Sequence, residues 1–393
     1  MKRILYTILL VSMVCLTVQP VWAKSKVLVV GYLEYGDDPR YEEAYTDNRF
    51  PAQPWGRPIE GVRMGLQDTR FAAMAANVEF KLEQRSISGA EELLPRFEEL
   101  FAAGAQFFML DLPGEMVAEL ASKTRGKPVL LFNLSALDDD LRQQQCQPQL
   151  MHIAPSRTML TDAVSQFLVS KKWRDLLVLK GTQPGDAAYY KAFQRSAKRF
   201  GLKPVAVRDF VLGRDPRQRS QNNVALLTAG VDYEVLYVID SNGEFARDVP
   251  YQDQQPRAVV GAAGLVADWW HWAWERNGAP QVNKRFRKQA KRHMSGYDWS
   301  GWLAVKVIAE ALLRNEAKDF SSLVKYIRGD EIALDGSKGY QLNFRKWNNQ
   351  LRQPIFLTTP NWVVAQAPLE GFLHPINNQD TLGFDDRESA CKF

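Results

Sequence analysis

Short apolar runs alternate with amphipathic segments along the first third of the chain. The apolar runs occupy residues 27–32, 78–82, 107–110 and 128–132. Continuous runs of this kind predict strands that are buried on both faces. Between them, apolar residues recur at helical spacing, with one helix opening at Pro58 and another following the capping-box pattern of Ser88 and Glu91. Alternating strands and helices predict βαβ units and a parallel sheet covered by helices.

The same alternation returns in the middle of the chain. Helices are predicted at 160–168 and 189–200 and strands at 176–179, 205–211, 235–239 and 258–260. No linker separates the two series, so we expect the chain to cross between two lobes near Ile153 and to return near 265–270. A helix around 302–312 should cover the first lobe, and 332–342 and 354–364 are expected to be late strands. The predicted fold class is therefore α/β, with two doubly wound parallel-sheet lobes, an interlobe cleft and a hinge.

The N-terminus has the pattern of an export signal. Lys2 and Arg3 precede an apolar run over 4–18, and the small-residue pattern of a cleavage site ends at Ala23. We expect cleavage after Ala23; an uncleaved anchor is the alternative, although the run is short for a transmembrane helix. The expected organisation is a signal peptide at 1–23, one lobe from 24–152 plus about 271–345, and another from 153–270 plus about 346–393.

Composition and cysteine count narrow the remaining classes. The 393 residues are 46% hydrophobic and 24% charged, which excludes a disordered chain or a polytopic membrane protein. A formal net charge of +5 is too small to indicate a nucleic-acid binder. Export would leave Cys146 and Cys391 as the cysteines of the mature chain, so a disulfide between them is predicted, with two free thiols as the alternative.

A binding site is expected where the two predicted sheets face each other. In open parallel sheets, ligands bind beyond the carboxyl ends of the strands, and two such lobes can close over a ligand by a hinge motion. The loops at these ends carry the expected ligand-binding residues Tyr32, Tyr35, Trp55, Asp111, Ser135, Gln183, Asp240 and Ser241.

Motifs for catalysis or metal binding do not stand out. The chain has neither a Gly-x-Ser-x-Gly nor a His-Glu-x-x-His motif, and the acidic run 138–140 lacks the alternating spacing of a calcium loop. We therefore expect no enzymatic activity, no metal and no cofactor. A hydrolase that uses Asp111 and Asp240 as its pair of carboxylates is the enzymatic alternative.

One stretch is unusually rich in tryptophan and basic residues. Four tryptophans lie within 269–274, and on a helix Trp270 and Trp274 would share a face that packs against the lobe junction; stacking on a planar ligand is the alternative. The basic residues within 276–293 are expected to form a solvated helix face rather than a nucleic-acid site. Contact with membrane lipid or an acidic partner is the other interpretation of this stretch.

Several segments, in order, resemble the type I periplasmic substrate-binding proteins of ABC transporters, the Leu/Ile/Val-binding family. They are residues 26–31, 55–56, 126–136, 153–156, 193–205 and 297–305. The resemblance covers nearly the whole mature chain. It implies a periplasmic, non-enzymatic monomer that captures a small molecule and presents it to a permease in the inner membrane. A ligand sensor, or an accessory protein for a periplasmic dehydrogenase, is the alternative.

The details are most similar to one sub-branch, the binding proteins associated with PQQ-dependent alcohol dehydrogenase systems. The residues concerned are 214–217, 220–223 and 269–278. This resemblance implies a link to alcohol oxidation, not that the chain binds PQQ.

The resemblance also implies roles for individual residues. Trp55 matches an aromatic lid, and Ser135 matches a loop that holds the ligand's carboxylate; a core tryptophan and a turn serine are the alternatives. Amino-acid-binding relatives hold the ammonium group with an acid after a Gly-Pro pair, whereas residues 261–264 here are Gly-Ala-Ala-Gly. A buried ammonium without a carboxylate is costly, so we expect a neutral, aromatic or carboxylate-bearing ligand instead of a branched-chain amino acid.

Overall fold

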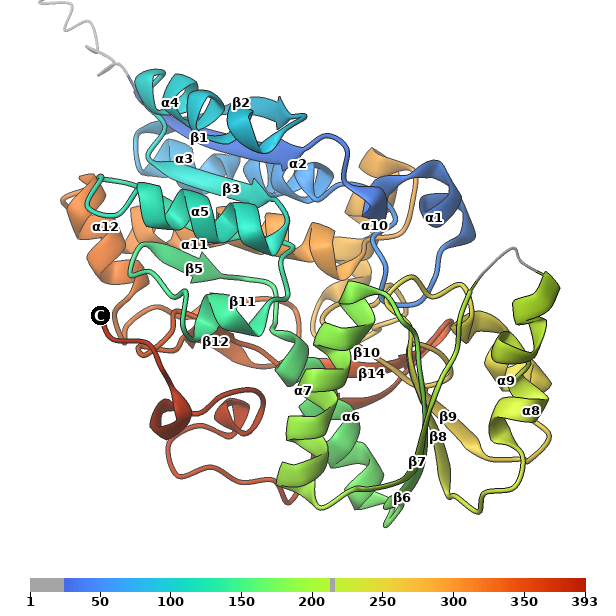
Figure 1. Cartoon of the computed structure of the whole chain (residues 1–393). Coiled ribbons are helices and arrows are strands. Elements are labelled where there is room, and N and C mark those ends of the chain that lie inside the picture. The colour runs from blue at the N-terminus through green and yellow to red at the C-terminus, as the bar shows by residue number, and fades with distance from the viewer. Residues whose placement is uncertain (1–24, 213–215) are drawn as a thin grey trace, which may run out of the picture.

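The computed structural model describes residues 25–212 and 216–393, and its elements are arranged around two separate parallel sheets (Figure 1). We call the parts built on these sheets the first and the second lobe. This architecture confirms the predicted α/β class with two parallel-sheet lobes. The predicted signal peptide, and Arg214 and Asp215 of the 214–217 segment, lie outside the described residues.

The sheet of the first lobe has five parallel strands in the order β2-β1-β3-β4-β5. The strands are β1 (Lys26–Tyr35), β2 (Val78–Ile87), β3 (Phe107–Asp111), β4 (Leu130–Asn133) and β5 (Leu150–His152). Helices α4 (Leu93–Ala102) and α5 (Gly114–Lys123) cover one face, and α2 (Ile59–Asp68), α3 (Arg70–Ala75), α11 (Gly296–Arg314) and α12 (Phe320–Ile327) cover the other (Figure 1). Strand β3 is buried throughout because successive residues alternate between these faces: Phe107 packs against Phe320 of α12, and Phe108 packs against Phe97 of α4.

Close contact between α2 and α11 depends on a glycine. A Cβ atom at Gly61 would clash with the carbonyl oxygen of Asp298 on α11. The helix at 302–312, whose place was predicted from its apolar pattern, therefore lies directly on the first lobe as α11.

The second lobe contains a four-stranded parallel sheet in the order β7-β6-β8-β9. Its strands are β6 (Asp175–Lys180), β7 (Lys203–Asp209), β8 (Val235–Ile239) and β9 (Ala258–Gly261). Helices α6 (Arg157–Ser170) and α7 (Pro184–Phe200) pack on one face, and the short helices α8 (Val224–Thr228) and α9 (Val249–Gln252) pack on the other. Helix α7 ends at Phe200, the predicted end of the helix at 189–200, because the next residue, Gly201, takes the left-handed conformation with φ of 67°.

Three chain segments run between the lobes and lie against one another. The first is residues 153–156, the second leads into β10 (Val266–Asp268), and the third follows β13 (Leu351–Arg352). Side chains of the third segment bind the backbone of the first: Gln353 Nε2 donates to the carbonyl of Ile153 at 2.6 Å. Two small antiparallel sheets adjoin the second and third segments. One comprises β10, β14 (Ile355–Thr359) and β15 (Trp362–Ala367), and the other comprises β11 (Leu334–Asp335), β12 (Gln341–Phe344) and β13.

Residues 269–274 do not form a helix, so Trp270 and Trp274 do not share a helix face, although Trp270 is buried in the core. After β10 the chain makes irregular turns, and α10 (Ala279–Ala290) begins only at Ala279. The tryptophan rings explain the difference, because their N–H groups have partners on separate elements: Trp269 Nε1 donates to Ser300 Oγ at 3.0 Å, and Trp270 Nε1 donates to Asn283 Oδ1 at 3.0 Å. These tertiary contacts fix a conformation that helical periodicity cannot predict.

The predicted capping box at Ser88 and Glu91 is also wrong. The 3-10 turn η2 (Ala90–Glu92) opens after Gly89, and Ser88 N donates to Glu92 Oε2 at 3.1 Å. The acidic side chain that reaches back is therefore one residue further along, and the Ser88 hydroxyl does not cap the helix.

Cys146 and Cys391 form the predicted disulfide. It joins the end of the chain to the loop that precedes β5 in the first lobe. Gln143 in the same loop strengthens the attachment, since its Oε1 accepts a hydrogen bond from Ala390 N at 2.8 Å. The last residues are thus held on the first lobe by one covalent bond and at least one hydrogen bond.

Candidate functional site

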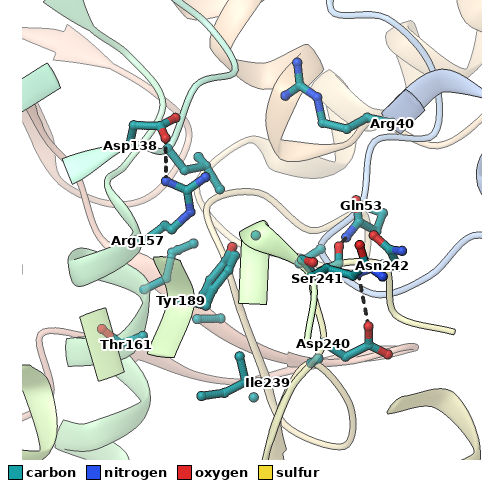
Figure 2. A pocket seen from close by; sticks show the side chains of 18 of the residues that line it. Arg40, Gln53, Asp138, Arg157, Thr161, Tyr189, Ile239, Asp240, Ser241 and Asn242 are labelled. Carbon is teal, nitrogen blue, oxygen red and sulfur yellow. Dashed lines mark hydrogen bonds and ion pairs between the residues drawn. The ribbon is translucent and has the colours of Figure 1, made fainter. Parts of the chain in front are cut away.

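A cavity of about 510 Å³ lies between the two lobes (Figure 2). It is bounded by loops that follow β3, β4, β8 and β9 and by the N-terminal turns of α5, α6 and α7. The lining residues with polar side chains are Arg40, Gln53, Glu115, Ser135, Asp138, Arg157, Thr161, Gln183, Tyr189, Tyr237, Asp240, Ser241, Asn242 and Tyr297. The cavity therefore lies beyond the carboxyl ends of the strands, where ligands bind in parallel α/β proteins.

Arg157 is one of the two arginines in the cavity wall. It is the first residue of α6, which the side chain of Ser156 caps by accepting from Met159 N at 3.2 Å. Figure 2 shows the guanidinium between the carboxylate of Asp138 and the ring of Tyr189. Nη1 donates to Asp138 Oδ1 at 2.8 Å, and Cζ lies 5.6 Å from the centroid of the Tyr189 ring.

The guanidinium of Arg157 retains a free donor. Its Nε is buried and has no hydrogen-bond partner among the described residues. Burial lowers the pKa of Arg157, but Asp138 and Tyr189 raise it by a larger amount, so the net pKa lies above its ordinary value. Arg157 is thus a charged, partly paired group in the wall of a cavity, which is a suitable partner for an anionic ligand.

Much of the remaining wall is apolar or aromatic. Tyr189 on α7, Tyr237 on β8 and Tyr297 on α11 contribute rings, and burial raises the pKa of each phenol, so all three are neutral. Apolar side chains from both lobes complete the surface, among them Leu137, Leu160, Val164, Ile239 and Val266. A ligand with a flat apolar part would find complementary surface here.

The acidic side chains in the cavity wall either already accept hydrogen bonds or form ion pairs, or they are exposed to solvent. Asp240 accepts hydrogen bonds from Asn242 N at 3.1 Å and from Ala246 N at 2.9 Å, so its carboxylate caps the turn after β8. Asp138 is paired with Arg157, and Glu115 is exposed. Ala262 lines the cavity, whereas the neighbouring Ala263 packs into the core of the second lobe. Among the described lining residues, no buried carboxylate is left to hold an ammonium group.

A segment of the first lobe, residues 37–54, reaches across to the second lobe. It contains η1 (Pro39–Tyr41) and α1 (Glu43–Asn48), which Figure 1 shows projecting beside the second lobe. Gln53 Nε2 donates to the carbonyl of Ser241 at 2.8 Å, and Arg247 Nη1 donates to Asn48 Oδ1 at 3.2 Å. Phe50, only 4% exposed, packs against Gly243 of the second lobe. The two lobes are therefore joined next to the cavity.

Four of the eight predicted site residues line the cavity: Ser135, Gln183, Asp240 and Ser241. Tyr35 and Trp55 are half-buried at other places, Trp55 against His293 with ring centroids 5.5 Å apart. Tyr32 and Asp111 are buried beneath the cavity wall rather than in it.

Asp111 organises a buried cluster behind the cavity. It accepts a hydrogen bond from Tyr41 Oη at 2.7 Å, and it lies 3.6 Å from Arg40 Nη2 and 3.4 Å from Arg57 Nη1. Burial raises the pKa of Asp111, while Arg40, Tyr41 and Ser135 oppose that shift. Because Arg40 also donates to the carbonyl of Ser135 at 3.2 Å, Asp111 positions a lining residue. Asp111 does not face the cavity alongside Asp240, so the two carboxylates do not form the pair that the hydrolase alternative needs.

Sequence reasoning did not select Arg40, Gln53, Arg157 or Tyr189. Arg40 and Gln53 belong to residues 37–54, which have no clear periodicity, but Arg157 follows the helix-capping Ser156 at the predicted crossing. The described residues also contain no group of three or more His, Cys, Asp or Glu side chains that could hold a metal ion. None of the described helices is long and apolar enough to cross a membrane.

Neither a protein-family model nor a curated protein matches this chain. Several solved structures, however, are similar to this chain. An ABC transporter substrate-binding protein from Sphaerobacter thermophilus has a TM-score of 0.71 at 13% identity, covering 91% of this chain and 100% of that one. A leucine-, isoleucine-, valine-, threonine- and alanine-binding protein from Brucella ovis, in its closed conformation, has a TM-score of 0.66 at 14% identity, covering 84% and 89%.

A third similar structure is an ABC-transporter solute-binding protein from R. palustris in complex with benzoate. Its TM-score is 0.65 at 11% identity, and the match covers 93% of this chain and 100% of that one. These likenesses establish that the chain has the fold of ABC-type periplasmic binding proteins, as its sequence resemblance implied.

Proposed function

We propose that this chain is the periplasmic solute-binding component of an ABC transport system and captures a small organic acid with a planar ring. The observation that carries the ligand class is Arg157, a charged guanidinium in the wall of the interlobe cavity, which among the described residues is hydrogen-bonded to Asp138 alone. A carboxylate beside it would accept a charge-assisted hydrogen bond. The ring of the ligand would pack on Tyr189 and the apolar lining.

Capture would follow from motion of the two lobes, 24–152 with about 271–345 and 153–270 with about 346–393, apart from the last residues, which the disulfide holds on the first lobe. When they part, the contact between Gln53 and Ser241 breaks and the cavity opens to solvent. When they close, Ser135 from one lobe and Gln183 and Ser241 from the other surround the ligand with polar groups. The closed form would then be the one presented to an inner-membrane permease.

Two further points bear on this proposal. The R. palustris protein of the same fold was solved with benzoate, which supports an aromatic acid as one ligand class that this fold can hold. The link to PQQ-dependent alcohol oxidation stays a prediction and rests on the sequence resemblance at 214–217, 220–223 and 269–278. A periplasmic location after removal of residues 1–23 belongs to the same proposal.

Benzoate is expected to bind at least about 100 times more tightly than leucine, isoleucine or valine. The amino acids would bury an ammonium group for which the lining offers no unpaired buried carboxylate, a cost of several kcal/mol. Calorimetry with benzoate, substituted benzoates, benzamide and the three amino acids tests this. Benzamide is the matched control because it keeps the ring and lacks the charge. Micromolar binding of leucine would refute the ligand class.

Trp55→Ala is expected to leave the affinity for benzoate within about threefold, because Trp55 does not line the cavity. The half-buried ring packs edge-on against His293, so its loss should lower the free energy of unfolding by about 1–3 kcal/mol. Urea unfolding and calorimetry on the same preparation measure both quantities. A tenfold loss of affinity with unchanged stability would instead assign Trp55 to the lid.

A further inference from the structure

Two tryptophans and three basic residues of 269–293, which do not line the interlobe cavity, meet on the surface in a second hollow. This groove, of about 870 Å³, lies between residues 272–275, helix α10 and the turn that joins β14 to β15. We call it the Trp272–Trp362 groove. Its lining residues are Trp272, Ala273, Trp274, Glu275, Pro280, Asn283, Lys284, Arg287, Lys288, His293, Asn361 and Trp362.

Two of its aromatic walls are held in place from behind. Trp274 Nε1 donates to the carbonyl of Ser337 at 3.1 Å, and the Trp274 ring lies 4.9 Å from that of Phe356. The Trp272 ring stacks on His293 with centroids 4.4 Å apart and planes 27° apart. Rings that are already fixed lose little conformational freedom on binding, so they are effective anchors for a partner.

The third tryptophan of the groove is exposed to solvent. Trp362 stands at the start of β15, directly after the hairpin turn, and is 58% exposed. A large ring at the rim of a hollow, next to two partly buried rings, forms an apolar surface of the kind that marks interaction sites.

The groove carries more positive than negative charge. Lys284, Arg287 and Lys288 are exposed on α10, and none of the three forms an ion pair with a described carboxylate. Their neighbour Arg285, by contrast, is paired with Asp68 at 2.7 Å. Glu275 is the acid among the lining residues, so three cations outnumber one anion.

We propose that the Trp272–Trp362 groove docks an acidic segment of a partner protein that carries an apolar or aromatic side chain. The cations would pair with the partner's carboxylates, and the tryptophans would hold its apolar side chain. The hollow shape favours a protruding segment over a flat lipid surface. This inference does not depend on which ligand occupies the interlobe cavity.

The test measures binding of fluorescent acidic peptides that carry one central Phe, Leu or Trp, with glutamine-substituted peptides as neutral controls. Anisotropy should show saturable binding of at least one acidic peptide, weakening as salt rises from about 50 to about 300 mM. The variant K284E/R287E/K288E and the variant W362A should each weaken binding at least about tenfold. The control variant K191E/K198E/K203E changes three exposed lysines of the second lobe and should weaken it less than about twofold.

Several outcomes would overturn the proposal. They are no binding of any acidic peptide by the unaltered protein, equal losses in the groove and control variants, or binding to anionic phosphatidylglycerol vesicles without binding to peptide. Unfolding midpoints accompany each variant, and W362A alters only an exposed hairpin position. A loss of affinity at an unchanged midpoint therefore assigns the effect to the groove.

Discussion

Replacing Asp380 with alanine is expected to lower the free energy of unfolding by about 3–5 kcal/mol, because it leaves a buried charge without its partner. Asp380 is fully buried in η6 (Asn378–Thr381). Its Oδ1 accepts hydrogen bonds from Arg345 Nε at 2.8 Å and from Arg352 Nε at 2.9 Å. Arg345 is itself almost completely buried, so the alanine variant would leave a guanidinium in the interior with no counter-charge.

The same cluster fastens the late part of the chain. Arg345 Nη2 donates to the carbonyls of Gln379 at 2.8 Å and Leu382 at 2.7 Å, which ties η6 to the region of β12 and β13. Burial lowers the pKa of Arg345, and Asp380 opposes that shift, so losing Asp380 further disfavours the charged form. The loss of stability should therefore include local loosening of 378–382 as well as the unpaired charge.

Urea unfolding of the Asp380→Ala variant measures the effect. The matched control is Asp330→Ala, which removes the exposed partner of Lys346 and should change stability by less than about 0.5 kcal/mol. A change below about 1 kcal/mol at Asp380 would contradict the view that this buried ion pair holds the C-terminal segment.

Most of the fold could be predicted from sequence because its central strands, such as β3, β4 and β8, are buried on both faces. Strands β3 and β4 read as unbroken apolar runs for that reason, and the glycine stop of α7 marked a helix end by its own conformational preference. The region after β10 could not be predicted, since its conformation is set by hydrogen bonds from tryptophan rings to α10 and α11.

The site was predictable in part, for a related reason. Ser135, Gln183, Asp240 and Ser241 directly follow strands, and parallel topology brings such positions together. The same rule also selects Asp111, and sequence cannot show that its carboxylate turns inward to Arg40 and Tyr41 instead of outward. This rule cannot predict that residues 37–54 reach the cavity, because they do so through contacts with the other lobe.

Arg157→Met is expected to weaken benzoate binding roughly thirtyfold to several-thousandfold, the equivalent of about 2–5 kcal/mol for losing one partner of a buried charge pair. Methionine keeps an apolar stem against the Tyr189 ring, so the change removes the donor and the charge more than the packing. Binding of benzamide should fall less than binding of benzoate, because benzamide has no charge to lose contact with.

Two further variants separate ligand binding from a structural role of the same residue. Arg208→Met removes another guanidinium, whose Nη1 donates to the carbonyl of Leu227 at 2.7 Å outside the cavity, and should leave the affinity unchanged. Asp138→Asn removes the charged partner of Arg157 and should preserve or strengthen benzoate binding, since the guanidinium is then free to pair with the ligand. If Arg157 served only to pair with Asp138, Arg157→Met and Asp138→Asn would both lower the unfolding midpoint and neither would alter the affinity. A loss of affinity in Arg157→Met together with a preserved or strengthened affinity in Asp138→Asn would place the ligand's carboxylate at Arg157.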